Sequence, residues 1–299
     1  MNITNKLLPT TVVGSYPVVK SLGLHALIDP LFNAVKTAVG DQIDVGIDII
    51  SDGQVRGDMI TVFTSRIPGI HGQTVFSRVE APQRSITLQD TKYALTRHPM
   101  VKGIITGPST LAHALKISTP VYRTREELIL DLARALVPEA RSLEAAGVRI
   151  LQIDEPIMST GMADLEIGRK AIEIITSNLA VHTCLHVCGE LIDVIDGILE
   201  MPVSILDFEF AASQENHHAL SGREIGDRLI GYGCVDTQDP SVESVSTILK
   251  RIERGIELLG PDTLLIDPDC GMRMLSRDVA FRKLQNMVEA VRRARIEHA

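Results

Sequence analysis

Eight short runs of apolar residues alternate with longer stretches of helical periodicity along this chain, and this alternation limits the possible folds more than any other feature. The runs are rich in Val, Ile and Leu, which is typical of parallel strands buried on both faces. They comprise TTVVGS, which ends at Ser15, and residues 47–50, 101–107, 148–154, 181–189, 203–209, 229–236 and 263–267.

Helical signals fill the stretches between these runs. Thr124 and Glu127 form a capping-box pattern at the start of one apolar stripe, and Gly147 marks its end. Eight strand–helix units within 299 residues predict an α/β protein of the (β/α)₈ type, a TIM barrel. A doubly wound open sheet is the alternative, because periodicity alone does not show whether a sheet closes.

Residues 69–100 interrupt the alternation. We interpret this stretch as an inserted hairpin between strands 2 and 3 of the barrel. Since the chain contains no linker and no low-complexity tract, we expect residues 1–299 to form a single domain.

The composition excludes several classes of function. The net charge is −8 and no block of Lys or Arg is present, which argues against nucleic acid as a partner. There is no apolar run long enough to span a membrane, and the N-terminus lacks the apolar core of a secretory signal. We therefore expect a cytoplasmic protein, in which cysteines indicate metal binding or catalysis before disulfides.

Chemically active side chains cluster where the predicted strands end, which is where TIM barrels carry their active sites. Two thiolates, one imidazole and one carboxylate from the ends of strands 5, 6 and 8 could converge on one Zn²⁺ ion. The four candidate ligands are His186, Cys188, Glu209 and Cys270.

Buried cysteines and histidines also occur without a metal, as small apolar or hydrogen-bonded side chains. We adopt this simpler interpretation for Cys184 and Cys234. For His186 and Cys188 taken alone, both interpretations stay open.

Five short motifs resemble one known family. LHVCGE, DFEFA and IDPDCGM are similar to the zinc-site segments of the catalytic C-terminal barrel of cobalamin-independent methionine synthase, and VVGSYP and QIDEP are similar to its substrate-binding segments. The order of the motifs matches over essentially the whole chain. The resemblance implies zinc ligands at the same four positions, His186, Cys188, Glu209 and Cys270.

The same resemblance implies a site for homocysteine. Asp154 would hold the amino group, and Ser15 with the backbone of Gly14 would hold the carboxylate. Gln54 stands where the family has a glutamate that contacts the amine. The alternative for Asp154 is a structural one, in which it caps the helix that follows.

The departures from the family concern folate. The chain has no tryptophan, on which the family stacks its folate, and Gln238 replaces a histidine proposed to protonate the leaving folate. We also expect no additional N-terminal barrel. The chain thus resembles the short, stand-alone methionine synthases of archaeal type. This implies zinc-dependent methyl transfer to the thiol of homocysteine, with a methylated corrinoid protein as donor in place of methyltetrahydrofolate.

Three other functions remain as alternatives. A thiol methyltransferase acting on coenzyme M uses a similar zinc barrel, but its sulfonate substrate requires a cationic partner, whereas Asp154 is an anion. A non-catalytic zinc-binding protein would bind metal without alkylating a thiol. A decarboxylase of the porphyrinogen type shares the barrel but has no use for a site of this composition.

Overall fold

The computed structural model describes residues 3–19 and 29–298. At its centre is a parallel sheet of six strands in the order β3-β5-β6-β7-β8-β9. The strands are β3 (Lys102–Thr106), β5 (Ile150–Asp154), β6 (His182–Val187), β7 (Ile205–Glu209), β8 (Leu229–Val235) and β9 (Leu264–Pro268). Almost every residue of these strands is buried, as the apolar runs predict.

Two further segments connect the edges of this sheet. Thr10 and Thr11 bridge in parallel to Ile266 of β9 and to Ile49, and Ile50 bridges in parallel to Val101. Backbone hydrogen bonds secure both joints, for example from Thr11 N to Ile266 O at 2.8 Å and from Lys102 N to Ile50 O at 2.8 Å. The parallel segments therefore form a closed ring, and the open doubly wound sheet is excluded.

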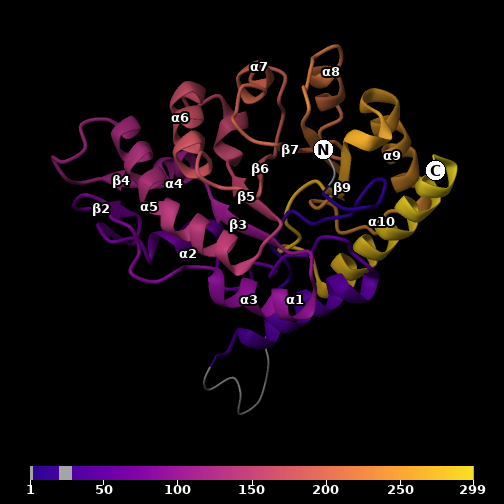
Figure 1. The fold of residues 1–299 in the computed structure, drawn as a ribbon, viewed down its shortest axis with the longest axis horizontal. Coiled ribbons are helices and arrows are strands. Elements are labelled where there is room, and N and C mark those ends of the chain that lie inside the picture. Colours follow the sequence, from indigo (N-terminus) through magenta and orange to yellow (C-terminus); the bar gives the residue numbers. More distant parts are fainter. Residues whose placement is uncertain (1–2, 20–28, 299) are drawn as a thin grey trace.

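Helices surround this ring (Figure 1). In the described residues they are α1 (Phe32–Val45), α2 (Met59–Thr64), α3 (Leu88–Arg97), α4 (Pro108–His113), α5 (Arg125–Ala146), α6 (Leu165–Thr176), α7 (Ile195–Ile198), α8 (Asn216–Leu220), α9 (Val245–Leu259) and α10 (Arg277–Glu297). Within residues 3–19 and 29–298, two short 3₁₀ helices, η2 (Pro156–Thr160) and η3 (Pro261–Thr263), lie in the connections. None of the helices in the described ranges is long and apolar enough to cross a membrane.

The longest helix begins and ends where its sequence predicts. Thr124 accepts a hydrogen bond from Glu127 N, and the Glu127 side chain returns to the backbone of the cap, so the capping box is complete. Gly147 then adopts a left-handed conformation, with φ of 102°, and ends α5. Local sequence thus determines both ends of α5.

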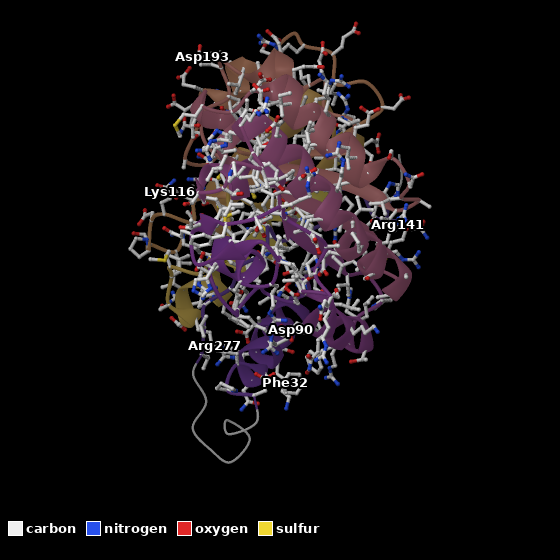
Figure 2. The ribbon with its side chains drawn as sticks, turned by 90° about the vertical axis from the view of Figure 1, so that its left-hand side faces the viewer. Phe32, Asp90, Lys116, Arg141, Asp193 and Arg277 are labelled. Carbon is white, nitrogen blue, oxygen red and sulfur yellow. The ribbon has the colours of Figure 1, made fainter. Side chains whose placement is uncertain are left out.

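The hairpin expected over residues 69–100 is not confirmed at that length. The antiparallel pair comprises only β1 (Ile70–His71) and β2 (Thr74–Val75), and β4 (Lys116–Ile117) joins β2 in parallel. The second half of the range is α3, which packs beside α1 through an edge-to-face contact of Phe32 with Tyr93, with ring centroids 5.2 Å apart. Figure 2 shows Phe32 and Asp90, from these two helices, at the same end of the molecule.

The interior of the ring is layered. One layer is apolar and contains Cys184, packed among residues Ile49, Ile150, Ile205, Leu229 and Leu265. One step nearer the carboxyl ends of the strands, the inward side chains are polar. The small apolar role expected for Cys184 fits this position, and Cys234 likewise lies buried in the main core.

Candidate metal centre

Three of the predicted ligands come together at the carboxyl ends of the strands. His186 lies in β6, Cys188 directly follows that strand, and Cys270 lies two residues beyond β9. One ligand atom from each residue lies within 4.8 Å of the other two. These three side chains could hold a metal ion.

The electrostatics of this group favour a shared proton between its thiols. A hydrogen bond with Cys188, together with the nearby His186, holds the pKa of the Cys270 thiol well below its ordinary value. The same hydrogen bond and burial raise the pKa of Cys188. The Cys270 thiol is therefore the one that loses its proton more readily, and Cys188 the one that keeps it.

His186 is almost completely buried, at 2% exposure. Burial alone would lower its pKa, but the Asp207 carboxylate and the two thiols outweigh this and raise it well above the ordinary value. Among the described residues, neither ring nitrogen of His186 has a hydrogen-bond partner. A buried imidazole without partners is costly unless another group uses its nitrogens.

Glu209 lies at the end of β7 but does not belong to this group of three. Its carboxylate accepts a hydrogen bond from the Ser213 hydroxyl. Its assignment as a fourth ligand therefore stays a prediction.

A cavity of about 270 Å³ opens beside the three side chains. Its lining includes the predicted substrate residues Ser15, Gln54 and Asp154. The apolar part of its wall is formed by Val13, Met59, Val62, Phe63, Ile86, Pro156 and Met274. A small molecule with one apolar end and a charged end fits such a cavity.

Asp154 is a buried carboxyl group of this cavity. It ends β5, directly opposite His186 in the strand register, and it accepts a hydrogen bond from Gln152 Nε2 at 2.6 Å. Burial raises its pKa to about 6, although His186 and Gln152 oppose that effect. It caps no helix among the described residues, because η2, the helix that follows it, has no side-chain cap hydrogen bond. Glu155 accepts the backbone N–H groups of Ser109 and Thr110 at the start of α4.

Two glycines make room for the other predicted substrate residues. A Cβ atom at Gly14 would lie 2.6 Å from Gln54 Oε1, and one at Gly271 would lie 2.0 Å from Ser15 Oγ. Gln54 itself has a φ of 43°, a left-handed conformation that is uncommon for a residue with a side chain. Gly14 does not line the main cavity but packs behind Gln54.

Further charged residues of this site have no assigned role in the sequence-based prediction. Asp52 lines the cavity, and burial raises its pKa to about 6. Arg56 also lines it but is engaged by Asp29 and Asp90 through paired hydrogen bonds. Its charge is therefore balanced by these two carboxylates. Arg273 lines the cavity as well, and its guanidinium donates to the backbone carbonyls of Gln54 and Gly57. Only the position of Asp52 just after a strand could have indicated its role.

A ring of parallel strands with two thiols and a buried imidazole at its carboxyl ends defines an α/β barrel with a candidate metal site. Residues 8–293 match the family model described as the catalytic domain of cobalamin-independent synthase. The chain belongs to this family, and the resemblance carried by the five motifs is confirmed.

Relatives of similar length support this assignment. A methionine synthase of Methanothermobacter marburgensis is 45% identical over 308 residues, which cover 94% of this chain and 98% of that protein. A methionine synthase of Methanocaldococcus jannaschii is 45% identical over 311 residues, covering 96% and 99% of the two chains. The fold matches the structure of a B12-independent methionine synthase from Shewanella sp. W3-18-1 in complex with selenomethionine, at a TM-score of 0.83 and 24% identity, covering 97% of this chain and 99% of that one.

Proposed function

We propose that this chain is a zinc-dependent methionine synthase, which transfers a methyl group to the thiol of homocysteine. One observation carries the proposal: the group of His186, Cys188 and Cys270 and the carboxylate of Asp154 line the same cavity. A thiol bound at the first would place an amine of the same molecule near the second. The full-length relatives named methionine synthases support this function.

The donor set fits zinc. Two thiolates and one imidazole are typical zinc ligands, and the unpartnered nitrogens of His186 provide a site that a metal would satisfy. When bound, zinc supplies a positive charge that keeps a substrate thiol deprotonated near neutral pH. We include Glu209 as the fourth ligand, because it ends the strand next to β6 and its carboxylate is nearly buried.

The other residues of the cavity bind and orient the substrate. Asp154 pairs with the ammonium group, and a buried pair of this kind is stronger than an exposed one. Ser15 and the backbone at Gly14 hold the carboxylate, and Gln54 contributes a neutral hydrogen-bonding group. The apolar wall excludes water from the reacting sulfur.

We further propose a methylated corrinoid protein as the methyl donor. In that reaction a sulfur–carbon bond forms as the cobalt–carbon bond breaks, and the electron pair stays on cobalt, so the leaving group needs no proton. The absence of tryptophan and the exposed position of Gln238, which does not line the cavity, both argue against folate. The donor would bring its own corrinoid, because the chain carries no D-x-H-x-x-G corrinoid motif.

We also propose that residues 1–299 form one domain. The main apolar cluster extends from Leu8 to Ala294, which supports one domain.

Methyl transfer from methylcobalamin to two thiols, homocysteine and coenzyme M, tests the function. We expect S-methylation of homocysteine and little of coenzyme M, because Asp154 would repel a sulfonate. Preference for coenzyme M would favour the sister methyltransferase. Stoichiometric zinc without methylation of either thiol would favour a non-catalytic zinc protein.

A further inference from the structure

A buried carboxylate lies directly behind the predicted metal ligand His186. Asp207 occupies the position in β7 that pairs with His186 in β6, and Figure 1 shows these strands side by side. The distance from His186 Nδ1 to Asp207 Oδ1 is 3.2 Å, and both side chains are at most 3% exposed. The two groups therefore face each other in a part of the ring that is closed to solvent.

Within the part of the chain that the structure describes, neither group makes a hydrogen bond. This holds for both oxygens of Asp207 and both nitrogens of His186, although Nδ1 and Oδ1 lie only 3.2 Å apart. Burial of a carboxylate without partners is strongly unfavourable. The cost of burying Asp207 indicates that its carboxylate has a function at this position.

The surroundings keep Asp207 charged and in place. Lys102 Nζ lies 4.0 Å from Asp207 Oδ2, and Lys102 is itself held by Val12 O at 2.8 Å and by Gln152 Oε1 at 2.7 Å. On the neighbouring strand β8, a Cβ atom at Gly231 would lie 2.7 Å from Asp207 Cγ. A glycine at that position is therefore needed to make room for the Asp207 side chain.

We propose that Asp207 is a positioning residue for the metal centre. It accepts a hydrogen bond from the Nδ1–H group of His186, which fixes the tautomer and the ring orientation and leaves Nε2 for the metal. The inference rests on the zinc site proposed above. Metal-binding histidines generally use their second ring nitrogen in this way, and loss of the partner typically lowers metal affinity about 10- to 100-fold.

The test measures zinc affinity of the purified full chain by competition with a chromophoric chelator. Asp207→Asn keeps a hydrogen-bond acceptor but loses the charge, so we expect affinity to fall about 10-fold. Asp207→Leu keeps the bulk but loses the acceptor, and we expect a fall of about 100-fold. Thermal unfolding of the metal-free proteins shows whether each variant folds. If Asp207→Leu does not fold, the zinc affinity of Asp207→Asn alone tests the proposal.

Asp41→Asn is the matched control. Asp41 is also a nearly buried carboxylate, at 3% exposure, but it bonds Tyr16 and Arg277 and does not line the cavity. It should lose thermal stability with unchanged zinc affinity. Wild-type affinity in a folded Asp207→Asn variant would overturn this inference alone, whereas a wild-type chain that binds no zinc would overturn the proposed function with it.

Discussion

Cys188 and Cys270, two of the proposed metal ligands, lie just beyond two strands that are not neighbours in the ring. Between β6 and β9 lie β7 and β8, so the two thiols approach each other across the mouth of the ring. A ring closed by packing of apolar side chains does not depend on a metal for its fold. The metal site and the fold should therefore be separable by mutation.

We expect Cys188→Ser and Cys270→Ser to abolish zinc binding while leaving the thermal unfolding of the metal-free protein nearly unchanged. Elemental analysis of the purified variants measures the first effect and calorimetry the second. Cys184→Ala serves as the control, because this cysteine packs among apolar side chains outside the group of three, and it should keep its zinc. Full zinc content in both ligand variants would refute the assignment.

Asp154→Asn should raise the KM for homocysteine far more than it lowers kcat. Loss of a hydrogen bond to a charged group costs about 1.5–3 kcal/mol, which corresponds to a ~10- to 150-fold effect. Steady-state kinetics with homocysteine and with a thiol of equal length that lacks the amine provide the measurement. If both thiols suffer equally, Asp154 has a structural role.

The pH dependence of this contact follows from burial. Because burial raises the pKa of Asp154 to about 6, the carboxyl group becomes protonated below that pH and no longer attracts an ammonium group. The ratio of KM for homocysteine to KM for the amine-free thiol should therefore rise as pH falls below about 6, by up to about tenfold per pH unit. In Asp154→Asn the ratio should be flat, and a residual slope would implicate Asp52, whose pKa is also about 6.

At the scale of elements, a helix outside the ring shapes the cavity within it. Glu139 of α5 is 2% exposed and accepts hydrogen bonds from Ile86 N at 2.7 Å and from Thr87 N and Oγ1, both at 2.8 Å. Ile86 and Thr87 line the cavity. The buried carboxylate thus links the crossover helix to the cavity wall.

Glu139→Gln should lower the free energy of unfolding by about 1.5–3 kcal/mol, because charged hydrogen bonds are replaced by weaker or mismatched ones. It should also raise the KM for homocysteine without loss of zinc. Urea denaturation and kinetics measure these effects. Glu144→Gln on the same helix is the control: Glu144 accepts from Ala180 N, away from the cavity, so its loss should leave KM unchanged.

At the scale of the whole molecule, a comparison of methyl donors is the decisive experiment. Methyltetrahydrofolate should give no measurable methionine, because general acid assistance is typically worth about 10²–10⁴-fold and Gln238 offers none. Methylcobalamin should give some product, and a methylated corrinoid protein from the same cell should give more, since docking supplies orientation. Product formation from each donor is the measurement. Efficient turnover with methyltetrahydrofolate would contradict the proposed donor.

The sequence by itself determined where the buried strands lie along the chain, the ends of α5 and the three side chains that meet at the candidate metal site. These features depend on local information: runs of apolar residues, a capping box at Thr124, and Cys or His at strand ends. The range 69–100 shows where such information was misread, because its second half forms the helix α3, which buries Thr91 and Ala94 three residues apart on one face. An interruption in the strand pattern is not by itself an insertion.

Only the tertiary structure decided whether the sheet closes and which distant side chains meet. Closure depends on the pairing of Thr10 with Ile266, residues from opposite ends of the chain, and no local pattern encodes such a pairing. The cavity wall held by Glu139, and the contact of Asp207 with His186, likewise arise from packing between elements. A side chain's neighbours across a ring depend on register and curvature, which are properties of the assembled sheet and not of any single segment.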